Sequence, residues 1–250
     1  MKRSFHRLVC LLATLPFWML APPAAAAEAE AEPSRVLLVT GIDYQGHHWK
    51  KTAPPLRAVL EKDPRLEVRI VDDLEFLATD VIFDYDVLFL HFKNYDQPQR
   101  FEAVRANLTR FLEEGGGIVL FHFACGAFEQ WDGFLDLAGR VWDKEKRGHD
   151  PRGPFTVRVV DREHPITSRL DDFEIDDELY TCLGGDRPIR VLATSRSKVD
   201  GQDYPMAFVR EGGRGRVFHT VLGHDVKAIA APGLAPLIQR ATLWAAGQTP

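Results

Sequence analysis

The sequence has 250 residues, of which 45% are hydrophobic and 27% are charged. This composition excludes a disordered, collagen-like or coiled-coil chain and is typical of a globular protein with one sizeable core. The formal net charge is -5, and neither sign is gathered into a long run, which argues against a nucleic-acid partner.

Residues 1–27 have the pattern of a secretory signal peptide. Three basic residues precede an apolar stretch at 8–20, and the alanines at 25–27 suit a signal peptidase. The apolar stretch is shorter than the roughly 20 residues that span a bilayer. We therefore expect a secreted or periplasmic protein with no integral membrane span in the mature chain. Residues 28–34 are expected to form a flexible leader, and a single domain is expected over 35–250.

Up to about residue 142 the sequence alternates apolar strands with amphipathic helices. Strands are predicted at 36–39, 66–71, 86–91 and 118–123, and helices at 54–62 and 99–114. Pro54 and Pro55 are expected in the first turn of their helix, where proline is tolerated. The alternation predicts parallel strands joined by right-handed crossovers, a fold that binds ligands beyond the carboxyl ends of its strands.

After residue 142 closely spaced strands are separated by Gly, Pro and Asp. They are predicted at 155–160, 173–180, 189–194, 205–209 and 216–221, in antiparallel or mixed pairing. A final amphipathic helix is predicted with Leu234, Leu237, Ile238, Ala241 and Trp244 on one face. The expected fold class is α/β, a doubly wound and mostly parallel sheet with an antiparallel extension in the C-terminal half.

Histidines occur at or just beyond the ends of the predicted strands. These residues are His47, His48, His91, His122, His219 and His224. Because parallel strands end at one edge of the sheet, we expect several imidazoles to meet in one cleft. Imidazole titrates near neutral pH, so proton transfer to or from a carbonyl or hydroxyl group is the preferred hypothesis. His122 and His224 are the candidates for proton transfer, and Glu178 is the candidate for orienting them.

The same residue types could also ligate a divalent metal such as zinc. The further ligands would be the carboxylates of Asp43, Asp177, Glu178 and Asp225. No spacing of a closed zinc motif occurs, so a metal site would have to be assembled from separate loops. No metal ligand is assigned from the sequence.

Cys125 follows the fourth predicted strand, where a strand turns into a helix and can present a nucleophile. A Cys-His-acid arrangement would take His219 or His224 as its base and Glu178 or Asp225 as its acid. The glycines that a tight elbow needs two residues before and after the cysteine are missing. A buried thiol, or a disulfide to Cys182 in an oxidising compartment, is the competing interpretation.

Aromatic residues flank the same edge of the predicted sheet and can stack on the apolar face of a sugar. They are Tyr44, Trp49, Trp131 and Trp142. The candidates for saccharide binding are His47, Trp49, His149, Tyr44 and Asp225.

Five segments carry a resemblance to a known family. They are GIVLFHFA at 117–124, RGHD at 147–150, HPIT at 164–167, DELY at 177–180 and GRVFHTVLGHD at 215–225. In this order they resemble the ThuA-like family, named for trehalose utilisation, over about residues 35–247. The resemblance implies a class I glutamine amidotransferase-like fold with a flavodoxin-like sheet, and a link to oxidised disaccharides or keto-sugars. In that superfamily a Cys-His-Glu triad operates from an elbow, and Cys125 and residues 219–224 fall at about the matching places.

Three functions are compatible with these features. The first is an exported enzyme that isomerises, eliminates or hydrolyses a saccharide or keto-saccharide by histidine acid-base chemistry. The second is a Cys-dependent hydrolase, and the third is a non-catalytic sugar-binding module. The small-molecule saccharide is the expected partner, and a homo-oligomer is compatible with the sequence.

Overall fold

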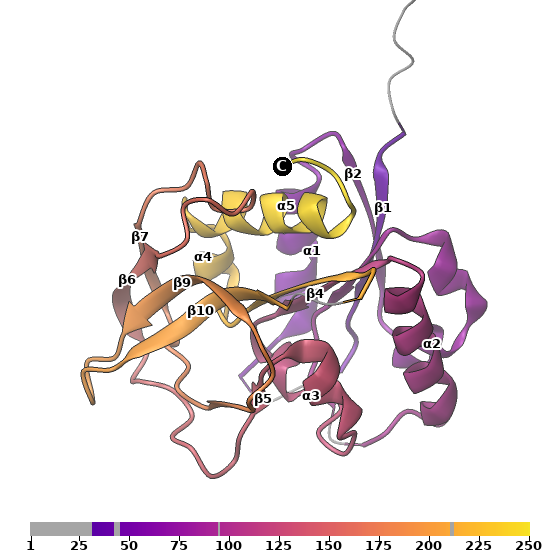
Figure 1. The fold of residues 1–250 in the computed structure, drawn as a ribbon, viewed down its shortest axis with the longest axis horizontal. Helices are drawn as coiled ribbons and strands as arrows, with labels where there is room; N and C mark the ends of the chain where they lie inside the picture. The colour runs from indigo at the N-terminus through magenta and orange to yellow at the C-terminus, as the bar shows by residue number, and fades with distance from the viewer. Residues whose placement is uncertain (1–31, 43–45, 95, 211–212) are drawn as a thin grey trace, which may run out of the picture. The chain divides into compact units, whose positions relative to one another are not determined.

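The computed structural model describes residues 32–42, 46–94, 96–210 and 213–250. Its main sheet has nine strands in the order β2-β1-β3-β4-β11-β10-β9-β6-β7 (Figure 1). The strands of the first half are β1 (Ser34–Val39), β2 (Leu66–Val71), β3 (Val87–Leu90) and β4 (Gly117–Phe121). The later strands are β6 (Gly153–Val159), β7 (Phe173–Asp177), β9 (Arg190–Arg196), β10 (Asp203–Arg210) and β11 (Arg216–Thr220). A separate pair consists of β5 (Val141–Trp142) and β8 (Leu183–Gly184).

The five strands from β2 to β11 form a parallel sheet. β3 and β4 are buried at every position, as expected for strands covered on both faces. β11 lies beside β4 and parallel to it, so this late strand completes the parallel half. The predicted α/β class, with a mostly parallel sheet and an antiparallel extension, is confirmed.

Helices cover both faces of the parallel half (Figure 1). One face packs against α1 (Trp49–Leu60), α4 (Val226–Ile229) and α5 (Leu234–Ala245). The other face packs against α2 (Phe101–Glu113), α3 (Gly133–Ala138) and the 3-10 helices η1 (Leu74–Ala78) and η2 (Asp80–Asp84). Because successive strand residues point to opposite faces, Leu37 belongs to the second core and Leu38 to the first.

The helix predicted at 54–62 begins five residues earlier, at Trp49. The expectation that Pro54 and Pro55 stand in its first turn is therefore wrong, because both lie inside the helix. A proline there removes the hydrogen bond to the carbonyl four residues earlier. Those carbonyls belong to Lys50 and Lys51, which are exposed, so water can solvate them.

The antiparallel extension turns back toward the parallel half of the sheet. β7 is the last strand in the order, four places beyond β11. The Asp177 carboxylate at the end of β7 nevertheless accepts hydrogen bonds from the backbone amides of Gly223 and His224, in the loop after β11. Twisted sheets of this width commonly curl. The curl brings Glu178 to the carboxyl ends of the parallel strands.

The predicted strand at 118–123 ends early, because the chain leaves β4 after Phe121. Residues His122–Gly126 form the 3-10 helix η3, and His122 has a left-handed backbone with a φ of 51°. At the other end of the domain, β1 begins at Ser34, one residue before the predicted domain start. Residues 32–250 group as one unit. Among the described residues, no helix has the length and hydropathy needed to cross a membrane.

Candidate functional site

His122 stands at the sharp turn between β4 and η3, and its side chain is fully buried. Left-handed backbone is unfavourable for a residue with a Cβ and is concentrated at functional sites. The ring is fixed because His122 Nδ1 lies 2.7 Å from the carbonyl oxygen of Val221. A carbonyl only accepts, so Nδ1 carries the proton and Nε2 of the neutral ring carries the lone pair.

Two donors approach that Nε2 atom, and Glu178 Oε2 lies 3.7 Å from it. His47 Nε2 lies 3.0 Å away and the Tyr180 hydroxyl lies 3.2 Å away. One lone pair accepts one strong hydrogen bond, so the two donors compete for it. Burial, followed by the nearby imidazole of His47, lowers the pKa of His122 well below its usual value. His122 is therefore a neutral base at ordinary pH.

His224 and Glu178 form the charged half of the site. His224 Nδ1 lies 3.1 Å from Glu178 Oε2. The hydrogen bond to Glu178 is the main cause that raises the pKa of His224, against the opposing effect of burial. Burial works against ionisation of Glu178 too, but the hydrogen bond and charge of His224 outweigh it and lower the carboxyl pKa. The pair favours a carboxylate next to an imidazolium.

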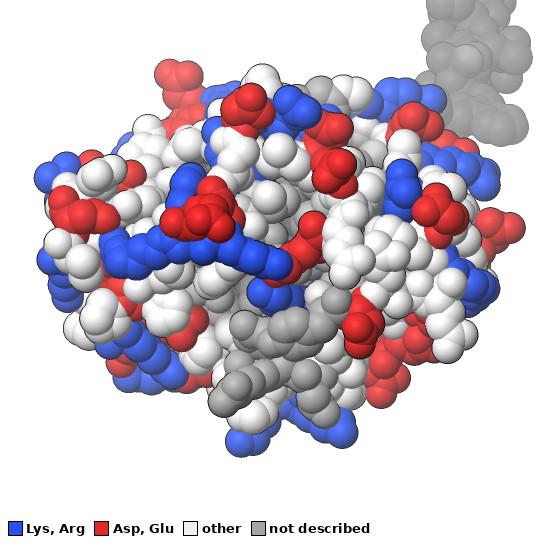
Figure 2. All heavy atoms as spheres, turned by 90° about the horizontal axis from the view of Figure 1, so that it is seen from below, with Lys and Arg blue, Asp and Glu red and all other residues white. Residues whose placement is uncertain are grey.

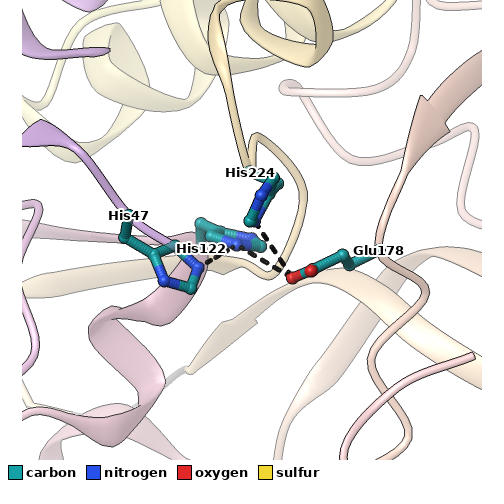
Figure 3. Close-up of side chains that lie close together, drawn as sticks. All are labelled: His47, His122, Glu178 and His224. Carbon is teal, nitrogen blue, oxygen red and sulfur yellow. Dashed lines mark hydrogen bonds and ion pairs between the residues drawn. The ribbon is translucent and has the colours of Figure 1, made fainter. Parts of the chain in front are cut away.

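The four side chains meet in one place (Figure 3). One donor atom from each of His47, His122, Glu178 and His224 lies within 4.8 Å of the other three. We call these four residues the His-Glu cluster. A cavity of about 180 Å³ opens onto it, and its wall includes Lys93, Phe123, Trp142, His149 and Tyr180.

Asp177 holds the loop that carries His224. Its side chain is fully buried and accepts from the backbone amides of Glu178, Gly223 and His224. Burial raises its pKa to about 6, although these hydrogen bonds act in the opposite direction. Asp177 therefore ties β7 to the loop after β11 and is not one of the donors of the His-Glu cluster.

The His-Glu cluster has the groups for two kinds of chemistry. A neutral imidazole base beside an imidazolium-carboxylate pair can accept one proton and donate another. Three imidazoles and one carboxylate are also the ligand types that zinc takes, in a tetrahedral set. The hydrogen bond from His122 Nδ1–H to Val221 resembles the outer hydrogen bonds that fix ligating histidines.

Of the other described binding candidates, His149 lines this cavity, and Trp49 and Asp225 do not. His149 lines it, with Nε2 3.8 Å from Glu178 Oε1 and its ring stacked on Tyr180. Trp49 is the first residue of α1. Asp225 caps α4, because its side chain accepts a hydrogen bond from the backbone amide of Ala228. Asp225 also pairs with Arg152. Tyr44 lies outside the described residues.

Cys125 lies within η3 and is 1% exposed. Burial raises the pKa of its thiol well above the usual value. Cys125 and Cys182 are both buried, free thiols in the structure, which has no disulfide between them. The strained residue after β4 is His122, not Cys125.

Two of the histidines are buried away from the His-Glu cluster. His219 points to the opposite face of the sheet, where Nδ1 lies 3.3 Å from the carbonyl oxygen of Ala138. Burial lowers its pKa to about 4. His91 contacts the Thr52 hydroxyl through Nε2 at 2.8 Å, and burial lowers its pKa to about 3. The base role considered for His219 beside Cys125 has no geometric support.

Sequence reasoning missed four residues that line the cavity: Gly46, Lys93, Phe123 and Tyr180. Tyr180 had the clearest signal, because it lies two residues after Glu178 in the segment that carries the family resemblance. Lys93 follows β3 by three residues, and Phe123 was assigned to a strand that ends before it.

The surface on the side of α3 and β5 carries both acidic and basic side chains, and neither charge dominates it (Figure 2).

The structure defines an α/β fold of the glutamine amidotransferase type. A structure from Thermoplasma acidophilum, described as that of a GMP synthase component, superposes with a TM-score of 0.54 at 13% identity. The alignment covers 87% of this chain and 96% of that chain. At this level of sequence identity the similarity shows a shared fold and nothing about activity.

The chain belongs to the ThuA family, described as trehalose utilisation, whose family model matches residues 35–245. It is similar to the structure of a ThuA-like protein from Parabacteroides merdae, with a TM-score of 0.77, 24% identity, and coverage of 87% of this chain and 92% of that one. A ThuA-like protein from Bacteroides uniformis has a TM-score of 0.70 and 20% identity, with coverage of 89% and 95%. No match is found among the curated proteins.

Proposed function

We propose that this protein is an exported enzyme that acts on a saccharide or keto-saccharide by proton transfer at the His-Glu cluster. The observation that carries the proposal is the meeting of four donor atoms within 4.8 Å at the carboxyl ends of β4 and β11. Open α/β sheets place their ligand sites at this edge. The sugar substrate is supported by the family description, trehalose utilisation.

In the proposed reaction the two histidines have different roles. His122 Nε2 accepts a proton from the substrate, either from a hydroxyl group or from a carbon next to a carbonyl. His224 donates a proton to the substrate oxygen, and Glu178 keeps the imidazole of His224 oriented and protonated. The Tyr180 hydroxyl competes with His47 for His122, so it can instead bond a substrate oxygen.

Binding of the sugar is assigned to the wall of the cavity. Trp142 supplies an aromatic ring, and His149 supplies an imidazole that is stacked on Tyr180 at the mouth. An aromatic ring can pack against the apolar face of a sugar. Isomerisation and elimination need an acid and a base on one bound ring, whereas hydrolysis needs the acid at the leaving oxygen and the base at the attacking water.

The Cys-dependent hydrolase has less support. A nucleophilic cysteine needs a thiolate that a substrate can reach. Cys125 is almost completely buried, and its raised pKa disfavours the thiolate. A non-catalytic sugar-binding module stays as the outcome to expect if no saccharide is converted.

A metal-assisted reaction on the same substrates is the second candidate. It is favoured by one observation, the set of three imidazoles and one carboxylate around a common centre. A metal held there would take the lone pairs of His122 and His224, and these residues would then be ligands. Metal content therefore separates the two candidates.

The test compares His224→Ala with His48→Ala on a keto-disaccharide. His48 is the exposed neighbour of His47 and serves as the matched control. We expect His224→Ala to lower the rate about 10²–10⁴-fold, the range for loss of one positioned acid or base. The control should keep the parent rate. Equal rates for His224→Ala and the parent would remove His224 from the mechanism.

Export is proposed from the pattern of residues 1–27. Expression of the full chain should place the mature protein in the periplasm or medium. N-terminal sequencing should find Glu28 as its first residue. Recovery of uncleaved chain in the cytoplasm would contradict this part of the proposal.

A further inference from the structure

A larger cavity, of about 590 Å³, lies beside the His-Glu cluster. Trp142 lines both cavities. Lys93 lines the smaller one, and its Nζ lies 2.9 Å from a carboxylate oxygen of Glu129, which lines the larger one. The same Nζ lies 5.0 Å from the centre of the Trp142 ring. Trp142 and the Lys93–Glu129 pair therefore form the partition between the two cavities.

The sizes of the cavities limit what each can hold. The cavity at the cluster measures about 180 Å³. This is below the range of about 300–1,000 Å³ that is typical of small-molecule sites, so it suits only the reacting part of a ligand. The larger cavity is within that range. A ligand that reaches past Trp142 would use both.

The lining of the larger cavity suits a neutral ligand rich in hydroxyl groups. Trp131 and Trp142 present half-buried indole rings, which can stack on a sugar ring. Four carboxylates and two cationic side chains supply hydrogen-bonding groups: Glu129, Asp132, Asp143, Glu145, Lys144 and Arg187. Both cations are already paired, Lys144 with Glu129 and Arg187 with Asp136. The excess of acidic groups disfavours an anionic ligand.

We propose that this cavity binds the second, non-reacting ring of a neutral two-ring saccharide whose first ring occupies the His-Glu cluster. The proposal rests on the proposed function for the position of the first ring. It adds the place of the second ring in the fold and the charge of the ligand. A two-ring substrate would then gain binding free energy that a one-ring substrate lacks.

Asp132 offers a way to block the larger cavity alone. It is exposed, lines the cavity, and makes no hydrogen bond or ion pair with the residues that the structure describes. Asp132→Trp adds bulk at this position, and Asp171→Trp, at an exposed residue that lines neither cavity, is the matched control. Thermal unfolding of each variant shows whether it is folded.

The experiment measures binding by calorimetry for glucose, for trehalose, and for trehalose oxidised to a carboxylic acid at one primary alcohol. The parent and the control variant Asp171→Trp should bind trehalose about tenfold or more tightly than glucose. They should bind the acid more weakly than trehalose. Asp132→Trp should lose the preference for trehalose while its affinity for glucose stays the same. Leu135→Trp, which fills the cavity from α3, repeats the test if Asp132→Trp unfolds.

Equal affinity of the parent for glucose and trehalose, no binding of either, or an unchanged preference in the folded blocking variants would overturn the subsite. Because binding is measured without turnover, the two proposals fail separately. A preference for trehalose with no conversion of any saccharide would keep the subsite and contradict the proposed enzyme. Conversion of a keto-saccharide without a preference for two rings would contradict only the subsite.

Discussion

The imidazoles of His47 and His122 face each other with their Nε2 atoms 3.0 Å apart, although the residues are separated by 75 positions in the sequence. His122 is held by its Nδ1–H bond to Val221, so its Nε2 is the acceptor and His47 Nε2–H is the donor. The arrangement fixes the tautomer of both rings. It also holds His122 Nε2 in the group of donor atoms that includes those of His224 and Glu178.

The tautomers are directly measurable. In metal-free protein, ¹⁵N-¹H correlation spectra of the imidazoles should show His122 protonated at Nδ1 and bare at Nε2. His47 should carry its proton at Nε2. The Nδ1–H form is the minority tautomer of free histidine, so its observation would not be expected without the bond to Val221. A proton on His122 Nε2 would contradict the assignment.

The thiol of Cys125 should be unreactive in the native protein. It is 1% exposed, although it lines the larger cavity, and burial raises its pKa, so little thiolate forms. Iodoacetamide followed by mass spectrometry should label neither Cys125 nor Cys182 quickly in the native protein, and should label both after unfolding.

The matching activity measurement uses Cys125→Ala, with Cys182→Ala as the control. Both variants should retain turnover, because neither thiol belongs to the His-Glu cluster. Fast native alkylation of Cys125 together with loss of turnover in Cys125→Ala alone would revive the Cys-dependent hydrolase.

His219 should make the protein less stable in acid. Burial lowers its pKa to about 4 in the folded state, against about 6.5 when unfolded. Between these values the unfolded chain binds a proton that the folded chain resists. The free energy of unfolding should therefore fall with falling pH, by up to about 1.4 kcal/mol per pH unit for this residue. His91 contributes in the same direction.

The variant His219→Asn removes this titration and keeps a donor for the carbonyl of Ala138. Urea unfolding at pH 7.5 and pH 5 should show a smaller loss of stability in the variant than in the parent. Equal losses in the two proteins would mean that His219 is not kept neutral by the fold.

Chelation separates direct acid-base catalysis from the metal-assisted candidate. The preferred mechanism predicts that dialysis against EDTA leaves turnover of a keto-saccharide unchanged. Elemental analysis should use protein purified without chelator or affinity tag. About one divalent ion per chain, with turnover lost on chelation and restored by zinc, would favour the metal-assisted reaction instead.

The interior of the fold could be predicted because its signals are local. The apolar runs of β1, β3 and β4 and the stripe of α2 are visible in the sequence. The start of α1 was missed because its prolines were assigned to a first turn. The strand predicted through Phe123 continued too far because the turn at His122 depends on contacts from the loop after β11.

The site could be predicted only in part. Parallel topology brings His47, His122 and His224 to one edge, so strand order alone anticipates their meeting. Glu178 reaches them because β7 curls back and Asp177 bonds the 223–224 backbone, and no local pattern encodes such a contact. Trp142 was grouped with the loop aromatics, yet its position between two cavities depends on the packing around β5.

The most direct test of the His-Glu cluster as the reaction centre is the rate at which parent and His122→Asn convert a keto-disaccharide, followed by NMR. Asparagine tolerates the left-handed backbone at this position and lacks a basic ring nitrogen. We predict conversion by the parent and a rate about 10²–10⁴-fold lower for the folded variant. Conversion by His122→Asn at the parent rate would contradict the central claim.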